Sequence, residues 1–424
     1  MRWIERPAYE THVATGLMVD VFMPVAGCPD CGALQRLPSS PHGETVSCVV
    51  CRTVLERGRG KSRAAALACS AATLLLLVPA NLAPFLTTSV LGVSRQSILA
   101  SSAQAMLQDG WPALAIVVLL FVVVLPPMRF GLLTLVLGLL HFHRRPPWLG
   151  RAFRCANALQ TWAMADVFLL GLAVAYARLR ASISVEVGIG AMCFIGAGVL
   201  SLLTRAFLDK GEIWRRIGPD VALPEASQPA LSCSSCELLL PLSFEGCRCP
   251  RCSATMHARK PESQGRSVAL TLAALLLYFP ANLYALATLP IGVTPTKYTV
   301  LQGIIDLANA KLIGLALLVF CASFAIPFLK LAGLSWCITS VIRRSKRHLV
   351  LKTRLFGIIE EIGRWSMVDP FVICCFTPVM HYNAFIYGRA EPAAVPFTAV
   401  VILTIIASKT FDPRRMWDAA RSRK

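Results

Sequence analysis

Long runs of apolar residues without a charged side chain set the strongest limit on how this chain can fold. Two of them, residues 64–94 and 267–296, contain no Asp, Glu, Lys or Arg. A helix needs about 20 apolar residues to cross the hydrocarbon core of a bilayer. The chain is 55% hydrophobic and 15% charged, whereas soluble domains carry about 25% charged residues. These features predict an all-α polytopic membrane protein.

The same criterion predicts eight membrane spans, four in each half of the chain. Four spans carry one charged residue in their interior, and the last span of each half is close to the lower limit of about 17 residues. The spans are expected at residues 64–94, 112–141, 154–178, 187–204, 267–296, 312–342, 365–388 and 392–408. About half of the chain is therefore expected to lie inside a bilayer.

Lysine and arginine are concentrated in alternate segments between these spans. The basic segments are residues 52–63, 144–154, 205–216, 343–354 and 414–424. The positive-inside rule assigns such segments, and hence both termini, to the cytoplasm, which agrees with an even number of spans. The net charge of +19 is explained by this topology, and attraction to anionic lipid headgroups is compatible with it. Nucleic-acid binding is not expected.

Four Cys-x-x-Cys pairs precede the two sets of spans. The first two pairs are separated by 16 residues and the last two by 12. Two such pairs can deliver four thiolates to one tetrahedral ion, which is the usual arrangement of a structural zinc site. The expected ligands are Cys28, Cys31, Cys48 and Cys51 in the first module, and Cys233, Cys236, Cys249 and Cys252 in the second.

Each cysteine module is too small to fold around a core of its own, so metal binding would supply its folding energy. We predict two zinc ribbons with structural Zn²⁺ sites, and iron is an alternative because four thiolates also suit iron. A redox role is disfavoured, since the thioredoxin-like βαβ setting of a redox Cys-x-x-Cys pair is absent. Four thiolates leave no open coordination position, so a catalytic metal is not expected.

The second half of the chain repeats the order of motifs in the first. Pro79-Ala80-Asn81 recurs 201 positions later as Pro280-Ala281-Asn282. Because each half holds an even number of spans, the repeats are expected to be parallel, with a pseudo-twofold axis along the membrane normal. The predicted domains are a ribbon at 1–60, a four-helix unit at 61–210, a linker with the second ribbon at 211–262, a second four-helix unit at 263–410 and a basic tail at 411–424.

Four ionisable residues lie inside the predicted spans: Arg129, Asp166, Lys330 and Asp369. Each is about 18–23 Å from a cytoplasmic basic segment, at 1.5 Å per residue. A lone charge at such depth costs at least about 2.5–3.5 kcal/mol, so we expect a base on one span to face the acid on the next. Two interpretations stay open: a structural ion pair between helices, or a polar cavity that handles a lipid headgroup or a proton.

Prolines interrupt the first and second spans of each half. Two of them, Pro79 and Pro280, are followed two positions later by Asn81 and Asn282. A proline removes a backbone hydrogen bond and can bend its helix. The asparagines are therefore expected to satisfy freed backbone groups or to bond across helices, and a substrate site at the broken helices is the alternative.

This ordered duplication resembles the paraquat-inducible protein A family of Gram-negative inner-membrane proteins. The resemblance is carried by the cysteine modules before each set of spans, by the two Pro-Ala-Asn motifs and by Trp-Ser-Met-Val-Asp at 365–369. In the first half, Ala163 and Ala165 replace the Ser and Val of that last motif. The resemblance implies an inner-membrane location, cytoplasmic zinc ribbons, and a partner among the MCE-domain proteins, which form lipid tunnels across the envelope.

The expected function is a component of an envelope lipid-transport system that loads or extracts lipid at the inner membrane. The sequence has no ATP-binding GxxxxGK[ST] loop, so proton uptake at Asp166 or Asp369 is the candidate energy source. Two other functions stay open: a stand-alone proton-coupled transporter of a small molecule, and a membrane scaffold that responds to metal or redox state. An enzyme is not expected, because no set of nucleophile, base and orienting residue is recognisable.

Overall fold

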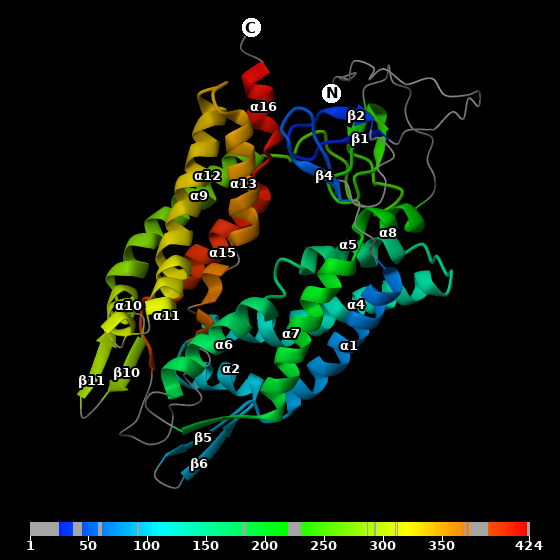
Figure 1. The fold of residues 1–424 in the computed structure, drawn as a ribbon. Coiled ribbons are helices and arrows are strands. Elements are labelled where there is room, and N and C mark those ends of the chain that lie inside the picture. Colours follow the sequence, from blue (N-terminus) through cyan, green and yellow to red (C-terminus); the bar gives the residue numbers. More distant parts are fainter. Residues whose placement is uncertain are drawn as a thin grey trace.

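The computed structural model is predominantly helical and has two helical arms that lie side by side (Figure 1). It describes residues 25–36, 45–57, 62–90, 93–180, 184–218, 230–285, 287–291, 294–309, 311, 313–363, 365–368, 370–372 and 389–421. One arm is the first unit, residues 62–218, and the other is the second unit, residues 263–421. The cysteine modules lie at one end of the arms and small β-sheets lie at the other end (Figure 1).

The first unit is a bundle in which α1 packs along α7 and α4. Its described helices are α1 (Arg63–Leu82), α2 (Leu99–Gln108), α3 (Pro112–Val118), α4 (Leu125–His141), α5 (Leu149–Leu159), α6 (Ala165–Arg180), α7 (Ile189–Phe207) and α8 (Lys210–Ile217). In α1, the exposed side chains are mostly apolar, with Leu75 71% and Leu82 75% exposed. Such an outer face suits contact with lipid rather than with water.

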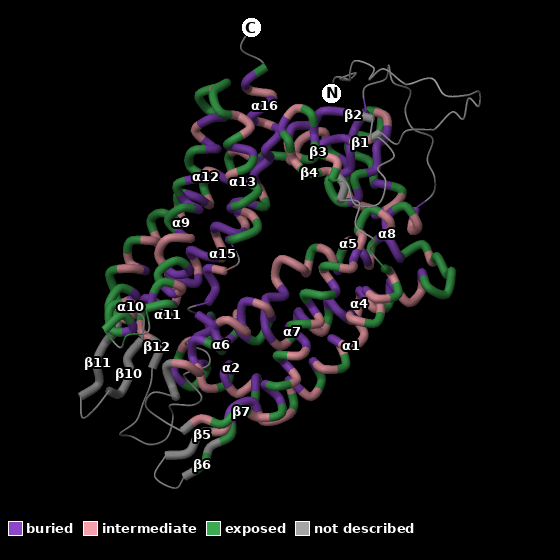
Figure 2. Tube along the Cα trace, viewed as in Figure 1, coloured by how far each residue is buried: buried purple, intermediate pink, exposed green. Residues whose placement is uncertain are grey.

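The second unit repeats this arrangement, with α9 packed along α15 and α12. Its described helices are α9 (Ser263–Leu283), α10 (Val300–Asn309), α11 (Ile313–Val319), α12 (Ile326–Ile342), α13 (Leu349–Ile362), the 3-10 turn η4 (Trp365–Met367), α15 (Ala394–Thr410) and α16 (Arg414–Arg421). Leu276 and Leu283 of α9 are 72% and 74% exposed, as their counterparts in α1 are. Figure 2 shows exposed residues along the outer sides of both arms.

Five helices in the described part of the chain are long and apolar enough to cross a membrane, against the eight spans expected from the sequence. They are Arg63–Leu82, Pro112–His141, Ile189–Phe207, Ser263–Leu283 and Ile313–Ile342. A sixth span results if α15 and α16, which are bent by 51° at their junction, are counted together. The apolar part of α6, Ala165–Ala177, is shorter, and residues 373–388 lie outside the described residues.

The expected first span is shorter than the uncharged run that predicted it. Helix α1 ends at Leu82 because Ala83 precedes Pro84, and a residue before proline is restricted to extended conformations. Further along the run, Leu86–Val90 form the strand β5. The expected third span, 154–178, is likewise divided: α5 ends at Leu159 and α6 begins at Ala165.

Each unit has one long helix that contains a π-helical turn directly before a proline. The turns are η1 (Leu119–Val124) before Pro126 and η3 (Phe320–Ala325) before Pro327. A proline cannot donate the usual hydrogen bond to the carbonyl four residues earlier, and the wider π turn accommodates that missing bond. The prolines of the second span in each repeat are therefore accompanied by π turns at equivalent positions.

Among the described residues the helices are accompanied by five small β-sheets, so the chain is mostly helical and not all-α as expected. One three-stranded sheet has the order β6-β5-β7 and the other has the order β11-β10-β12. Their strands are β5 (Leu86–Val90), β6 (Val93–Ser97), β7 (Ser184–Val187), β10 (Ala287–Ile291), β11 (Thr294–Tyr298) and β12 (Arg389–Ala390). The cysteine modules contain the paired strands β1 (Val25–Gly27) and β2 (Leu34–Arg36), β3 (Thr45–Ser47) and β4 (Val54–Arg57), and β8 (Ala230–Ser232) and β9 (Leu239–Pro241).

The two units meet through equivalent residues of the repeat. Phe168 of α6 and Phe371, which follows η4, are 203 positions apart in sequence, and their rings pack edge to face with centroids 5.6 Å apart. Gly171 allows this close approach, since a Cβ there would lie 3.1 Å from the Cβ of Phe371. A residue that contacts its own repeat equivalent lies close to the axis that relates the repeats. The described parts of the two Trp-x-Met-x-Asp segments thus lie close to the junction of the units.

Candidate functional site

Each cysteine module brings its four thiols into one buried cluster. The sulfur atoms within each cluster all lie within 4.8 Å of one another. The shortest separations are 3.4 Å between Cys28 and Cys51, and 3.6 Å between Cys233 and Cys252. Four sulfurs around one zinc, with Zn–S bonds of about 2.3 Å, are about 3.8 Å apart. Both clusters therefore match the geometry of a tetrahedral metal site and could hold an ion such as zinc.

The backbone around each Cys-x-x-Cys pair forms the same tight turn. In every case the residue after the second cysteine has a positive φ: Gly32, Arg52, Glu237 and Ser253. Its backbone N–H donates to the carbonyl of the first cysteine, at 2.9 Å for Arg52 and 2.8 Å for Ser253. This turn aims both sulfur atoms of a pair at one point, so the local sequence determines the ligand geometry.

The thiols of a cluster cannot all ionise without a cation. Hydrogen bonds with Cys31, Cys48 and Cys51 raise the pKa of Cys28, whereas hydrogen bonds in the same cluster, that with Cys28 first, lower the pKa of Cys48. The four thiols of a cluster therefore do not ionise independently of one another. A divalent ion would neutralise the charge of several thiolates at once, which is how metal binding becomes coupled to folding.

The first ribbon, residues 25–36 and 45–57, docks on the second unit. Arg414 at the start of α16 donates a hydrogen bond from Nε to the carbonyl of Pro29 at 2.9 Å. Trp417 of α16 packs in one apolar cluster with the four cysteines of this ribbon and with Val50. Leu349 and Val350 at the start of α13 pack against the same cluster.

The second ribbon, residues 230–258, docks on the first unit. Gly150 of α5 is in such close contact with it that a Cβ there would overlap the carbonyl oxygen of Arg251. Trp214 of α8 packs edge to face on Phe153 of α5, with ring centroids 4.8 Å apart, in the same apolar cluster as the cysteines of this ribbon. Trp214 and Trp417 are 203 positions apart, so the two docking surfaces are repeat equivalents.

The ribbons are therefore exchanged between the two halves of the chain. Each ribbon precedes the bundle of its own half along the chain, whereas the structure docks it on the bundle of the other half. Leu34, Ala230 and Leu239 also form an apolar cluster between the two ribbons. Arg259, just after the second ribbon, forms two hydrogen bonds with Asp418 of α16, at 2.6 and 3.0 Å. Both units are thus connected through the metal-binding modules.

The junction of the units also contains a forked ion pair. Arg205, in the last turn of α7, donates from Nη1 to Asp166 Oδ2 at 3.3 Å and from Nη2 to Glu361 Oε1 at 3.1 Å. Asp166 belongs to the first unit and Glu361 to the second, so one arginine connects them. Asp166 lies in the first turn of α6 and Arg205 in the last turn of α7, where each charge also interacts favourably with its helix dipole.

Further basic residues surround this fork. Arg129 is only 4% exposed, and its guanidinium lies 4.9 Å from the ring centroid of Phe130. Desolvation, followed by the positive charges of Arg129, Arg205 and Lys409, lowers the pKa of Lys210 in α8 to about 8. The spacing of the sequence predicts that Arg129 and Asp166 lie at similar depth. It does not indicate a role for Arg205, which belongs to a basic segment used only to predict the topology. The counterpart of Asp166, Asp369, lies outside the described residues.

Lys330 is buried in the second unit. It is 2% exposed, and its Nζ has no hydrogen-bond partner within the described part of the chain. The ammonium lies beside the end of α13, where a Cβ on Gly363 would be 2.6 Å from Nζ. The C-terminal end of a helix carries a partial negative charge and favours a cation there.

The two asparagines of the Pro-Ala-Asn motifs bond to their own helices. Asn81 Nδ2 donates to the carbonyl of Leu77 at 2.6 Å, and Asn282 Nδ2 donates to that of Tyr278 at 2.8 Å. Both Oδ1 atoms are buried and have no hydrogen-bond partner among the residues that the structure describes. Each asparagine thus bonds to a backbone carbonyl of its own helix, as one of the two expectations proposed. Its Oδ1 atom remains available as a hydrogen-bond acceptor among the described residues.

Two repeated helical units with long apolar helices, combined with two four-cysteine modules, define a class of multi-pass membrane proteins with metal-binding ribbons. The chain belongs to the paraquat-inducible protein A family, whose model matches residues 63–218 and 265–421. Each match begins with the first long helix of a unit and ends with the amphipathic helix that docks a ribbon.

Curated relatives cover nearly the whole chain. It is 30% identical over 400 residues to the intermembrane transport protein PqiA of Escherichia coli (strain K12). The aligned region covers 92% of this chain and 95% of that protein. It is also 30% identical to the lipophilic envelope-spanning tunnel protein A of the same strain, over 93% of this chain and 91% of that protein. A probable intermembrane transport protein of Haemophilus influenzae is 24% identical over 92% of this chain. No solved structure matches the chain at a significant level.

Proposed function

We propose that this protein is the inner-membrane component of an MCE-type envelope lipid-transport system, where it loads or extracts lipids. The observation that carries the proposal is the similarity, over more than nine-tenths of the chain, to relatives named as intermembrane transport and envelope-spanning tunnel proteins. The exposed apolar faces of α1 and α9 and the basic segments at the ribbon end support it. In this proposal both ribbons and both termini are cytoplasmic, and each unit contributes four spans.

The forked ion pair is the proposed place where proton uptake acts on the two units. If Asp166 takes up a proton, it no longer attracts Arg205 as an anion, and Arg205 keeps only Glu361 as its acidic partner in the fork. Glu361 is 72% exposed, and exposed ion pairs contribute only about 0–1 kcal/mol. Protonation of Asp166 would therefore loosen the connection between α6, α7 and the second unit.

A conservative variant tests this role. We expect Asp166→Asn to lower lipid transfer to a purified MCE partner by about tenfold, because a hydrogen bond to a charged group contributes about 1.5–3 kcal/mol. The measurement is transfer of fluorescent lipid from proteoliposomes, with the same comparison made for Asp369→Asn. Glu212→Gln is the control, since Glu212 pairs with Arg63 and Arg216 away from the junction. Wild-type transfer by both aspartate variants at normal protein levels would remove these residues from the mechanism.

Co-purification separates the proposal from its alternatives. An envelope transport component is expected to bring down an MCE-domain protein and phospholipid in mild detergent. Proton-coupled solute uptake in liposomes without any such partner would favour the stand-alone transporter. A metal-responsive scaffold would instead require reversible loss of the metal from the cysteine clusters, and inert metal at two ions per chain would count against it.

A further inference from the structure

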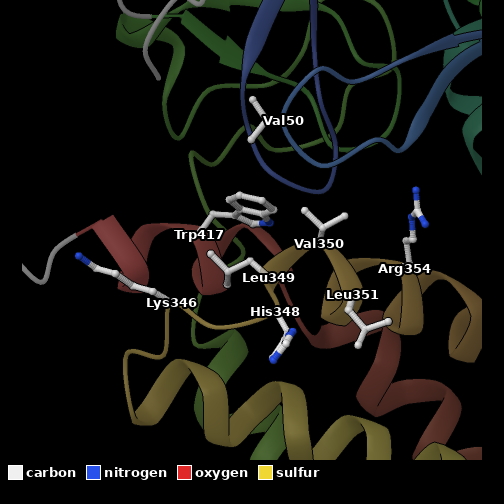
Figure 3. Close-up of a pocket in the computed structure, with 8 residues that line it drawn as sticks. All are labelled: Val50, Lys346, His348, Leu349, Val350, Leu351, Arg354 and Trp417. Carbon is white, nitrogen blue, oxygen red and sulfur yellow. The ribbon is translucent and has the colours of Figure 1, made fainter.

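An open cavity lies where the first ribbon meets the second unit (Figure 3). Its volume is about 550 Å³. The basic side chains of Lys346, His348 and Arg354 line it, and none of its described lining residues is acidic. The lining is therefore positively charged, which suits an anionic ligand.

The side chains in the middle of the cavity lining are apolar, and one of them, Trp417, is fixed by a hydrogen bond. Figure 3 shows Val50 of the ribbon opposite Trp417 of α16, with Lys346 and Arg354 on opposite sides of them. Trp417 is 8% exposed, and its Nε1 donates a hydrogen bond to Thr353 Oγ1 at 3.2 Å. An anionic ligand here would also contact an apolar surface, which a free inorganic anion cannot use.

An exposed apolar track leads away from the cavity along α13. Leu351 lines the cavity and is 54% exposed; Ile358 and Ile362 further along the helix are 54% and 40% exposed. These positions are seven and eleven residues beyond the first, so at about 100° per residue they share one face within about 20°. The cavity and the track together have the shape of an amphiphile, with charge at one end and apolar surface beyond it.

We propose that this cavity binds the headgroup of an anionic phospholipid whose acyl chains lie along the α13 track. Basic pockets at the cytoplasmic ends of membrane helices have the charge that anionic headgroups require. A second cavity of about 540 Å³ on the same connection is lined by Arg343 and Arg347, which extends the positive surface. Because Lys346 and Arg354 lie on opposite sides, a lipid with two phosphates, such as cardiolipin, fits better than a lipid with one. None of the residues that line the cavity belongs to the forked ion pair, and the proposed headgroup site goes beyond the proposed transport function.

Native mass spectrometry of the full-length protein tests the proposal, with cardiolipin, phosphatidylglycerol and phosphatidylcholine added in turn. We expect affinity to fall in that order, and the double variant Lys346→Gln with Arg354→Gln to weaken cardiolipin binding by about tenfold or more. The charge-preserving pair Lys346→Arg with Arg354→Lys should retain binding. Leu351→Asn should also weaken cardiolipin binding, since it interrupts the apolar track without removing charge.

The matched control is Arg145→Gln with Arg154→Gln. Arg154 and Arg354 are each the sixth residue of their helices, α5 and α13, so this control removes two charges from the equivalent segment of the first unit. Unchanged cardiolipin binding in this control supports the site. Equal loss in the control, equal binding of phosphatidylcholine, or displacement of cardiolipin by millimolar inorganic phosphate would overturn it. Normal metal content of each variant establishes that the ribbon beside the cavity is folded.

Discussion

Four thiolates within 4.8 Å of one another would repel each other, and a cation bound between them would neutralise their charge. At each cluster the positive φ after the second cysteine and the returning N–H group direct both sulfurs inward. The clusters are buried, so water cannot compensate an isolated thiolate. At the residue scale, a metal ion bound at each cluster would therefore contribute to the folding of its ribbon, and the surrounding apolar residues complete the packing.

Loss of one thiol should empty one cluster and leave the other intact. We expect Cys48→Ser to reduce the metal content from two ions per chain to one. Three thiolates and a hydroxyl bind a soft metal ion less tightly than four thiolates do. Elemental analysis of the purified protein measures this. The controls Cys155→Ser and Cys247→Ser change exposed thiols outside the clusters and should keep two ions. Two ions in Cys48→Ser, or none, would contradict independent metal sites.

At the scale of elements, the short amphipathic helix at the end of each unit is the docking partner of a ribbon. Asp209 caps α8, accepting from the N–H of Glu212 at 3.1 Å, and Asp412 precedes α16, accepting from the N–H of Arg414 at 3.1 Å. Each cap starts a helix that presents a tryptophan to a ribbon. The exchange of ribbons follows because Trp417 contacts the first ribbon while α5 and α8 contact the second.

Adding one methyl group at Gly150 should weaken the contact between the second ribbon and the first unit. In Gly150→Ala the new Cβ would overlap the carbonyl oxygen of Arg251, and overpacking of this kind costs about 1–3 kcal/mol. We expect faster hydrogen exchange across residues 230–258 with two metal ions still bound. In Gly138→Ala the added methyl has nothing within 4 Å, so exchange should not change. Unaltered exchange in Gly150→Ala would mean that the docking contact does not hold the ribbon.

At the scale of the whole molecule, both ribbons lie at one end of the arms and the two three-stranded sheets at the other (Figure 1). The ribbon end also carries the basic connections, which the positive-inside rule assigns to the cytoplasm. At this end the units are connected by the ribbons, each docked on the unit of the other half, and by the ion pairs of Arg205. The ring contact between Phe168 and Phe371 also connects them, close to the axis that relates the repeats.

Labelling with a membrane-impermeant maleimide tests the orientation. We expect the exposed Cys247 of the second ribbon to react only after the membrane is opened. The variant Gln108→Cys, at the end of α2 near the sheets, should react in intact spheroplasts. Serine at the exposed Cys155 and Cys321 keeps the signal specific. Labelling of Cys247 in intact spheroplasts would reverse the proposed topology.

The sequence by itself determined the features that depend on local or periodic information. The cysteine spacing grouped the ligands as the structure does, the uncharged runs located the long helices, and the repeated motifs revealed two units. The tertiary structure alone decided which ribbon docks on which unit and that Asp166 is paired with Arg205. Residue counting does not indicate this pair, because the chain breaks between α5 and α6, and Asp166 at the start of α6 lies beside Arg205 at the end of α7. Such contacts join residues far apart in sequence, and their free energy depends on packing that no local pattern encodes.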